Sequence, residues 1–351
     1  MTASPFIEIA GRRIGADQSP YVICELSGNH NGSLERCLTM VDAAAATGCD
    51  AIKIQTYTAD TITLDVDRPE FRIHGGLWDG RTLYELYEEA HTPFEWHAAI
   101  FERARQRGVT IFSSPFDETA VDLLDSLGAP AFKIASFEAI DIPLIQYAAG
   151  KGKPLIISTG MANLREIEAA RDAALSAGAA GVLLLHCVSS YPATFADANV
   201  RTVADMAARF GCPVGLSDHT PGTAASVAAV SVGACAVEKH FTLARADGGP
   251  DAAFSLEPVE FKALVDDCKN AWASLGAVNY DLLGSERGSL LFRRSLYVTA
   301  DVKAGEPLTR ANVRSVRPGN GLPPADLEKV LTGKASRDLT RGEPLDWSMV
   351  G

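Results

Sequence analysis

The sequence predicts a closed (β/α)₈ TIM barrel followed by a small, mostly β module, and three observations support this prediction. Eight short apolar runs are separated by segments with a helical pattern, which is typical of a parallel sheet buried on both faces. Most runs recur at intervals of about 20–30 residues, the length of one βα unit. After about residue 280 the pattern changes to short segments separated by turn residues. The predicted strands cover residues 22–25, 51–55, 110–114, 132–136, 155–159, 182–186, 214–219 and 236–240.

Capping residues mark where the predicted helices begin and end. Residues 1–20 are expected to form a short hairpin ahead of the first barrel strand. In the helix after that strand, Ser33 can accept hydrogen bonds from first-turn amides, and Gly48 can end the helix. Asn163 and Glu166 have the spacing of a capping box, so they predict the start of the helix after the fifth strand.

The connection between the second and third predicted strands is longer than the others. Residues 57–95 exceed what one barrel helix requires, and they include Trp78 and the pair Tyr84 and Tyr87. Chemistry in a (β/α)₈ barrel takes place at the carboxyl ends of the strands, where this connection starts. We therefore expect the insertion to form a lid over a substrate.

The last part of the chain carries a near-repeat. Residues 301–308 (DVKAGEPL) return as residues 338–345 (DLTRGEPL), and each copy holds a Gly-Glu-Pro turn signal beside short apolar segments. This pattern predicts a compact β module with little regular helix. The sequence thus divides into a barrel domain over 1–282, a linker over 283–293 and a C-terminal module over 294–351.

The composition is that of an ordinary globular protein. Apolar residues make up 47% and charged residues 22% of the 351, and the formal net charge is −12. An acidic chain argues against sequence-independent nucleic-acid binding, which needs a basic surface. The longest weakly polar stretch is shorter than the roughly 20 residues of a membrane span. No signal peptide is recognisable and the seven cysteines are scattered, so we expect reduced thiols and a cytoplasmic location.

Two histidines end the last two predicted strands. His219 and His240 would be neighbours in a closed barrel, each beside a carboxylate, Asp218 or Glu238. Two imidazoles at adjacent strand ends can bind one divalent ion and leave positions open for water and a substrate oxygen. A single histidine at a strand end is more often a hydrogen-bonded structural residue, but the pair together favours a metal site.

Lys53 and Lys133 lie within apolar runs, where a lysine costs several kcal/mol unless it is paired or faces water. One interpretation is an ion pair with Glu25 or Glu238. The other is that both lysines clamp an anion such as phosphate or carboxylate. Hydroxyl groups end the third, fourth and fifth strands, and together with the lysines they favour an anion site. These hydroxyls belong to Ser114, Ser136 and Ser158.

Taken together, these segments resemble the sialic acid synthase family, metal-dependent enzymes that condense phosphoenolpyruvate with an amino sugar. The resemblance covers essentially the whole chain, and the C-terminal module resembles the antifreeze-like (SAF) domain of that family. The motifs are specific as a set. They are Glu25 with NHNG at 29–32, KIQT at 53–56, FKIAS at 132–136, STGM at 158–161, SDHT at 217–220, EKHFT at 238–242, GPD at 249–251 and RPGNG at 317–321.

The resemblance implies a role for each of these residues. His219 and His240 would bind Mn²⁺ or a similar ion, with Mg²⁺ or Co²⁺ as alternatives. Phosphoenolpyruvate would be held by Lys53 and Lys133 and by the three serines named above. Arg317 would reach from the C-terminal module of one subunit into the barrel of its partner, which implies a domain-swapped homodimer. The residues expected around the sugar and the metal-bound water are Gln55, Ser189, Tyr191, Asp251 and Glu238.

Within the family, the details resemble the branch that makes pseudaminic acid, a surface-glycan precursor, from 2,4-diacetamido-2,4,6-trideoxy-L-altrose. Two departures from the sialate-forming pattern argue against N-acetylmannosamine: Ser189 replaces an asparagine, and Leu26-Ser27 replaces Ile-Gly. A synthase of N-acetylneuraminate or legionaminic acid, acting on a mannosamine-type sugar, is the alternative. The segments that carry this finer resemblance are ELSGNH at 25–30, QTYTADT at 55–61, YELY at 84–87, RADGG at 245–249 and AFSLEP at 253–258.

The resemblance implies a condensation at this site. The metal would polarise the sugar aldehyde, C3 of phosphoenolpyruvate would attack it, and water would add at C2 before phosphate leaves, with Glu25 or Glu238 as base. The residues leave two other classes open. One is a Schiff-base aldolase that uses Lys53 or Lys133 as nucleophile. The other is a carbohydrate-binding protein on an inactive barrel.

Overall fold

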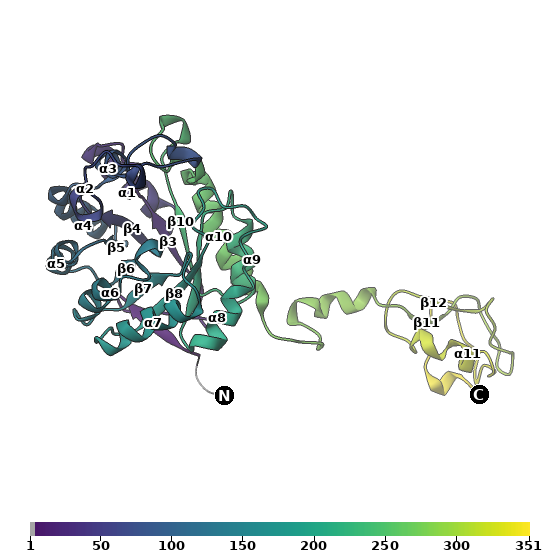
Figure 1. The fold of residues 1–351 in the computed structure, drawn as a ribbon. Helices are drawn as coiled ribbons and strands as arrows, with labels where there is room; N and C mark the ends of the chain where they lie inside the picture. Colours follow the sequence, from purple (N-terminus) through teal and green to yellow (C-terminus); the bar gives the residue numbers. More distant parts are fainter. Residues whose placement is uncertain (1–3) are drawn as a thin grey trace. The chain divides into compact units, whose positions relative to one another are not determined.

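Eight parallel strands close into a barrel in the computed structural model, which describes residues 4–351 (Figure 1). The order around the barrel is β10-β3-β4-β5-β6-β7-β8-β9, so each strand pairs with the next in the chain and the last pairs with the first. The barrel predicted from the sequence is confirmed. The strands are β3 (Tyr21–Glu25), β4 (Ala51–Thr56), β5 (Thr110–Pro115), β6 (Phe132–Ile134), β7 (Leu155–Ser158), β8 (Val182–Cys187), β9 (Val214–Asp218) and β10 (Ala236–His240).

A helix follows each strand and covers the outside of the barrel (Figure 1). The first begins where Ser33 Oγ accepts a hydrogen bond from the Arg36 amide at 3.2 Å, and the fifth begins with the capping box of Asn163 and Glu166. Both predicted caps are confirmed. The outer helices are α1 (Leu34–Ala46), α4 (His97–Gln106), α5 (Glu118–Ser126), α6 (Ile142–Ala149), α7 (Leu164–Ser176), α8 (Thr202–Phe210), α9 (Ala224–Ser231) and α10 (Pro258–Leu275).

The predicted N-terminal hairpin packs at the amino end of the barrel. It consists of the antiparallel strands β1 (Phe6–Ile9) and β2 (Arg12–Gly15). Ile7, Ile9 and Ile14 are buried in one apolar cluster with Tyr21, Ala51 and other barrel residues. A side chain on Gly181, just before β8, would lie 2.7 Å from Ile7 Cγ2, so the hairpin fits closely there. The apolar packing fills this end and leaves the carboxyl end for a cavity.

The insertion between β4 and α4 folds into a series of short helices. These are α2 (Ala59–Ile62), η1 (Pro69–Phe71), η2 (Gly76–Trp78), α3 (Leu83–Ala90) and η3 (Phe94–Trp96). The sequence predicted the insertion but not its helices, because segments of three to eight residues are too short for a clear periodic pattern. The insertion starts at the carboxyl end of β4, on the side of the barrel where the cavity lies.

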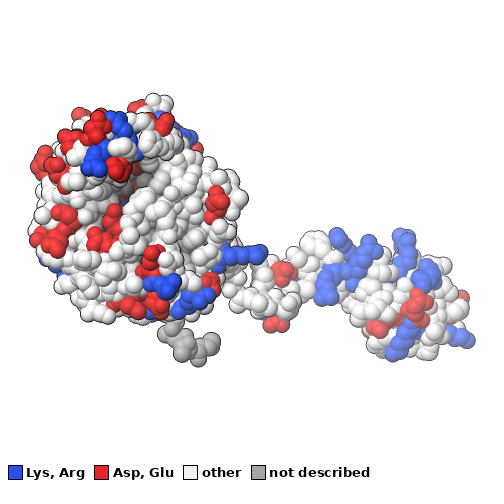
Figure 2. Space-filling model, viewed as in Figure 1, with Lys and Arg blue, Asp and Glu red and all other residues white. Residues whose placement is uncertain are grey.

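Residues Met1–Gly276 and Ala277–Gly351 form two compact units. The second unit contains η7 (Gly284–Phe292), the antiparallel pair β11 (Ser295–Val298) and β12 (Val313–Val316), η8 (Pro324–Asp326), α11 (Leu327–Val330) and η9 (Trp347–Met349). The sequence's linker over 283–293 lies within this unit and largely coincides with η7. Segment 294–351 carries nine Lys and Arg against seven Asp and Glu, whereas the whole chain is acidic. In Figure 2, basic side chains are prominent on the second unit and acidic ones on the barrel, and each unit also shows some of the opposite charge.

The near-repeat explains how the second unit is built. Val302 and Leu339, at the same position in the two copies, exchange backbone hydrogen bonds of 3.0 and 2.8 Å. Asp338 accepts a bond from the Ala304 amide, and Asp301 accepts one from the Arg341 amide, so the two copies cap each other. The repeated sequence is therefore a pair of segments that bond to each other across a local pseudo-twofold.

All seven cysteines are buried and form no disulfide. Along residues 4–351, no helix combines the length and hydropathy that crossing a membrane requires.

Candidate active site

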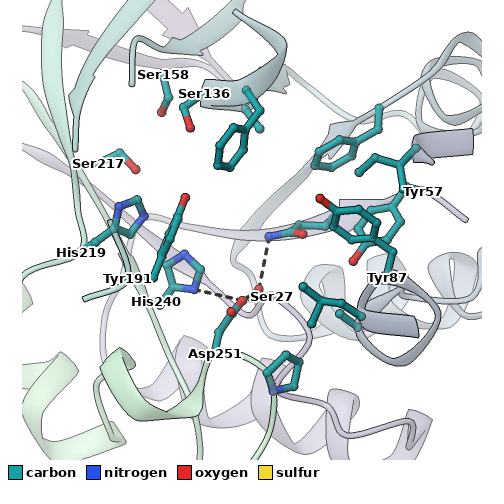
Figure 3. Close-up of a pocket in the computed structure, with 18 of the residues that line it drawn as sticks. Ser27, Tyr57, Tyr87, Ser136, Ser158, Tyr191, Ser217, His219, His240 and Asp251 are labelled. Atoms are coloured by element: carbon teal, nitrogen blue, oxygen red, sulfur yellow. Dashed lines mark hydrogen bonds and ion pairs between the residues drawn. The ribbon is translucent and has the colours of Figure 1, made fainter. Parts of the chain in front are cut away.

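A cavity of about 470 Å³ lies at the carboxyl ends of the barrel strands (Figure 3). Its walls come from β4, β6, β7, β8, β9 and β10 and from several connections that follow strands. Residues from distant parts of the sequence meet here because all eight strands point the same way. The polar lining residues are Ser27, Lys53, Gln55, Lys133, Ser136, Ser158, Cys187, Tyr191, Ser217, His219, Glu238, His240 and Asp251.

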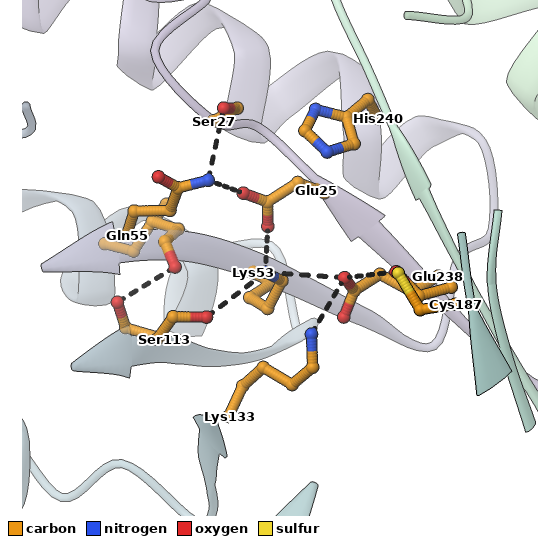
Figure 4. A network of polar contacts seen from close by, with 12 residues as sticks. Glu25, Ser27, Lys53, Gln55, Ser113, Lys133, Cys187, Glu238 and His240 are labelled. Carbon is orange, nitrogen blue, oxygen red and sulfur yellow. Dashed lines mark hydrogen bonds and ion pairs between the residues drawn. The ribbon is translucent and has the colours of Figure 1, made fainter. Parts of the chain in front are cut away.

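Four charged side chains form a buried network at the base of the cavity (Figure 4). Lys53 Nζ lies 3.0 Å from Glu25 Oε2 and 3.5 Å from Glu238 Oε1. Lys133 Nζ lies 3.1 Å from the same oxygen of Glu238. Each of the four is at most 3% exposed, so the charges depend on one another for stability. Both lysines also line the cavity. The two interpretations of the sequence, an ion pair and an anion site, are therefore compatible.

The two glutamates differ in acidity. Burial raises the pKa of Glu25, and the Glu238 charge adds to this effect against the opposing Lys53. Burial acts in the same direction on Glu238, but Lys133 and Lys53 outweigh it and lower the pKa of that carboxyl to about 2. Glu238 is therefore the permanent anion of the network, and Glu25 is the carboxylate that accepts a proton more readily.

His219 and His240 stand together at the ends of β9 and β10, with ring centres 5.3 Å apart. His219 Nδ1 donates a hydrogen bond to the Val188 carbonyl at 2.9 Å, which leaves the lone pair on Nε2. Within residues 4–351, His240 Nδ1 is buried without a hydrogen-bond partner, and Asp251 Oδ2 lies 3.7 Å from it. Burial lowers the pKa of both histidines, so both imidazoles are neutral.

This histidine pair has the chemistry of an open divalent-metal site. Metals bind the neutral imidazole, and a ring nitrogen of each residue is free for it. Two imidazoles bound to one ion at about 2.1 Å have ring centres about 5 Å apart, close to the observed separation. The part of the chain that the structure describes has no cluster of three or more His, Cys, Asp or Glu that could hold a metal. With the two imidazoles as its protein ligands, a metal would keep positions open for water and substrate.

Three serine hydroxyls face the cavity near the two lysines (Figure 3). Ser158 Oγ is buried and has no hydrogen-bond partner among residues 4–351. Ser136 Oγ shares a hydrogen bond of 2.8 Å with Ser189 Oγ. Ser217 Oγ donates to Glu238 Oε1 at 3.2 Å. Together with the lysines, these groups offer several donors to an anionic ligand.

Three of the predicted site residues lie beside the cavity and do not line it. Ser114 is buried, and its hydroxyl accepts a hydrogen bond from Lys53 Nζ at 3.2 Å, so it supports the lysine. Glu25 lies behind two lining residues: its Oε2 is 3.0 Å from Lys53 Nζ, and its Oε1 accepts a hydrogen bond from Gln55 Nε2 at 2.9 Å. Ser189 touches Ser136 from a neighbouring groove formed by the connections after β7 and β8. Arg317 belongs to the second unit, where its guanidinium lies 5.9 Å from the Phe292 ring centre.

The insertion after β4 lines part of the cavity with mostly apolar side chains. Trp78 Nε1 donates a hydrogen bond of 2.9 Å to the Pro250 carbonyl, which fastens the insertion to the connection after β10. Tyr191 packs between the Trp78 ring and the His219 ring. Of the tyrosine pair named in the sequence, Tyr87 lines the cavity and Tyr84 does not. The wall residues are Tyr57, Ile62, Ile73, Trp78, Leu83, Leu86, Tyr87 and Ala90.

Three polar lining residues, Ser27, Cys187 and Ser217, were not among the predicted site residues. The period of two along β9 could have revealed Ser217, because it lies two residues before His219 and so points to the same side. Ser27 has no such signal, because it follows the end of β3 in an irregular turn whose direction only the tertiary structure defines.

Two protein families match this chain, one over the barrel and one over the C-terminal module. Residues 40–280 match the NeuB family, and residues 293–351 match the SAF domain. A pseudaminic acid synthase of Campylobacter jejuni is 44% identical over 94% of this chain and 96% of its own. A pseudaminic acid synthase of Helicobacter pylori is 41% identical over 93% and 97%. An N,N'-diacetyllegionaminic acid synthase of Legionella pneumophila is 34% identical over 96% of each.

Two solved structures extend the comparison to the fold. The N-acetylneuraminic acid synthetase of Leptospira borgpetersenii superposes with a TM-score of 0.73 at 30% identity, over 82% of this chain and 95% of that one. The spore coat polysaccharide biosynthesis protein SpsE of Bacillus subtilis superposes with a TM-score of 0.67 at 30% identity, over 99% of both.

Proposed function

The chain belongs to the NeuB family, and from this premise we propose that it is a pseudaminic acid synthase. The reaction joins phosphoenolpyruvate, 2,4-diacetamido-2,4,6-trideoxy-L-altrose and water, and it yields pseudaminic acid and phosphate. The observation that carries the proposal is that one cavity is lined by two lysines, several serines, two neutral histidines and the apolar wall of the insertion. The greater identity to pseudaminic acid synthases than to legionaminic acid synthases favours this sugar.

Phosphoenolpyruvate fits the side of the cavity where the lysines lie. Lys53 and Lys133 present ammonium groups whose charge is partly offset by Glu25 and Glu238. The unpartnered Ser158 hydroxyl gains a bond when a phosphate or carboxylate oxygen arrives. Because these donors are already in place, they stabilise the negative charge through the reaction without having to rearrange.

We assign a divalent ion, with Mn²⁺ as first choice, to His219 and His240. The ion supplies Lewis acidity toward the sugar aldehyde when it is bound. The protein holds the two imidazoles neutral by burial and orients the His219 ring through its bond to Val188. Mg²⁺ and Co²⁺ are the alternatives.

Glu25 is the general base of the proposal. C3 of phosphoenolpyruvate forms the new C–C bond to the aldehyde carbon, and the positive charge left at C2 takes up water. Glu25, which lies just outside the cavity lining beside Lys53 and Gln55 and has a raised pKa, is the proposed acceptor of the proton from that water, and the C2–O bond to phosphate then breaks. Glu238 remains ionised between the two lysines and keeps them charged and oriented.

The sugar fits the part of the cavity that the insertion lines. A 6-deoxy sugar with two acetamido groups has three methyl groups, and the insertion offers an apolar wall that would bury them. Gln55, Tyr191 and Asp251 supply the polar contacts between this wall and the histidines.

We further propose that two chains form a domain-swapped homodimer in which Arg317 of one reaches the cavity of the other. Each unit on its own exposes apolar side chains that a partner would cover. On the barrel they are Phe137, Ile140, Met161 and Phe195, in the connections after β6, β7 and β8. On the second unit they are Val278, Tyr280, Leu282, Leu283, Leu291 and Phe292.

We also propose a cytoplasmic location. The buried free thiols fit a reducing cytoplasm, where phosphoenolpyruvate is made.

Phosphate release from phosphoenolpyruvate tests the proposed function directly. With Mn²⁺, we expect turnover with 2,4-diacetamido-2,4,6-trideoxy-L-altrose and little with N-acetylmannosamine. Turnover only with mannosamine-type sugars would move the enzyme to the sialic or legionaminic branch. Inactivation by borohydride with substrate, together with activity in the presence of a chelator, would instead indicate a Schiff-base aldolase.

The metal assignment has its own test. We expect His240→Ala and His219→Ala to lose both bound Mn²⁺ and activity, because each removes one of two protein ligands. His74→Ala, which changes an exposed histidine in the insertion, is the matched control and should retain both. Bound metal is measured by elemental analysis after gel filtration. Activity in the metal-free His240→Ala enzyme would reject the site.

A further inference from the structure

Ser27 adopts a backbone conformation that residues with a side chain rarely take. Its φ is +49°, in the left-handed region that favours glycine. Along residues 4–351, the other non-glycine residues with positive φ are Ala10, Asn31 and Asn199, and asparagine tolerates this region well. A glycine would adopt this conformation at a lower cost than a serine does. We therefore ask what the Ser27 hydroxyl contributes.

The hydroxyl of Ser27 joins two residues of the sugar side of the cavity (Figure 3). It donates a hydrogen bond to Asp251 Oδ2 and accepts one from Gln55 Nε2 at 3.2 Å. The same amide nitrogen of Gln55 donates to Glu25 Oε1 at 2.9 Å (Figure 4). Ser27 is only 3% exposed, so these bonds form away from bulk water.

The segment around Ser27 has little freedom to move. A side chain on Gly28 would lie 2.9 Å from Pro250 Cγ and 3.0 Å from Ala90 Cα. The connection after β3 is therefore held between the end of α3 and the connection after β10. This packing limits how far the backbone that carries the Ser27 hydroxyl can shift.

The bonds made by Ser27 determine which atoms remain for a ligand. With Nε2 of Gln55 and Oδ2 of Asp251 engaged, Gln55 Oε1 and Asp251 Oδ1 are left. Neither has a hydrogen-bond partner within the described part of the chain, and both residues line the cavity. Both free atoms are acceptors, which suit the N–H and O–H groups of an amido sugar.

We propose that Ser27 is a positioning residue for sugar recognition, which holds Gln55 and Asp251 with two acceptor oxygens directed to the sugar. This inference rests on the proposed function and deepens it. A glycine at position 27 would relieve the backbone, but it would release Asp251 and leave Gln55 held by Glu25 alone. An alanine would remove the same two bonds and keep the unfavourable backbone.

Two variants and a matched control test the proposal in the full-length enzyme. We expect Ser27→Gly and Ser27→Ala to raise the KM for the diacetamido sugar by about tenfold or more, as for the loss of a buried hydrogen bond. The KM for phosphoenolpyruvate should change by no more than about twofold, because the lysines and serines that hold it are untouched. In thermal unfolding, Ser27→Gly should be at least as stable as Ser27→Ala, because it removes the unfavourable φ.

Ala10→Gly provides the control. Ala10 also has a φ of +49°, but it lies exposed in the turn between β1 and β2. This variant should relieve the same backbone conformation and leave both KM values unchanged. An unchanged KM for the sugar in Ser27→Gly, or an equal rise for both substrates, would overturn the inference. A wild-type enzyme that turns over no sugar would overturn the proposed function and the inference together.

Discussion

Charged residues along β10 show how one residue's position in a strand decides its role. Glu238 and His240 point into the barrel and line the cavity, whereas Lys239 between them points to the helices outside. Lys239 Nζ lies 2.8 Å from Asp218 Oδ2 and 2.6 Å from the Thr220 carbonyl. This outer ion pair joins the ends of β9 and β10 from behind, so it helps fix the spacing of the two histidines. Lys239 thus stabilises the outer face of the barrel, whereas the lysines Lys53 and Lys133 line the cavity.

Glu138 carries a prediction about pH and stability. It lies in η4 (Ser136–Glu138), and its Oε2 is buried without a hydrogen-bond partner within residues 4–351. Burial raises the pKa of Glu138 from its ordinary 4.5 to about 7. The folded state therefore holds this proton more tightly than the unfolded chain does. The contribution of Glu138 to stability must fall as the pH rises from about 4.5 to 7.

We expect Glu138→Gln to be more stable than the wild type at pH 8, by on the order of 2 kcal/mol, with a smaller difference at pH 5. Urea unfolding at the two pH values measures this difference. Glu168→Gln, the same change on the exposed face of α7, is the matched control for the loss of one surface charge. A difference that does not grow with pH would show that Glu138 ionises in the folded protein as it does in the unfolded chain.

At the level of elements, the insertion between β4 and α4 both lines the cavity and bonds to the connection after β10. Gly75, Gly76 and Gly80 all have positive φ, so the chain on either side of Trp78 turns sharply and presents the indole to the cavity. The Trp78 indole then bonds to the Pro250 carbonyl. The insertion is attached at this point to the connection that carries Asp251, so both segments are held together at the cavity.

We expect Trp78→Phe to raise the KM for the sugar by about three- to tenfold, because the ring stays but the hydrogen bond to Pro250 is lost. Steady-state kinetics with both substrates measures this effect. Trp272→Phe removes a comparable indole donor on α10, far from the cavity, and should leave the kinetics unchanged. Equal effects of the two substitutions would mean that the Trp78 bond does not organise the sugar site.

At the level of the whole molecule, the barrel contains its own complete core. All eight strands and the eight outer helices lie between Tyr21 and Leu275, within the first unit. The second unit has a separate apolar cluster that includes Leu296, Val313 and Leu345. Two cores of this kind imply that each unit can fold independently. The activity, however, depends on both units if Arg317 completes the site of a partner.

A truncated chain that ends at Gly276 tests this dependence. We expect it to fold as a monomer and to lose nearly all turnover, and we expect the full chain to be a dimer. Light scattering after gel filtration measures the mass, and phosphate release measures the activity. In the full chain, Arg317→Ala should keep the dimer and raise the KM for the sugar. Full activity in the truncated monomer would contradict the domain-swapped arrangement.

The sequence alone determined the barrel, the helix caps and the catalytic side of the fold. Buried parallel strands read as apolar runs, and the residues at their carboxyl ends must meet at one edge. For this reason Lys53, Lys133, His219 and His240 could be predicted from their positions in the runs, and all four line the cavity. The family also followed from short motifs at the same strand ends.

Only the tertiary structure decided the acidity of these residues and which of them line the cavity. Glu25 and Glu238 look alike in the sequence, but contacts with lysines from other strands give them different acidities. Ser114 turned out to support Lys53, and Ser27 lines the cavity, because a side chain's direction at a strand end depends on twist and on the turn that follows. Local sequence sets periodicity and caps, whereas burial, pKa and hydrogen-bond partners arise from residues far apart in the chain.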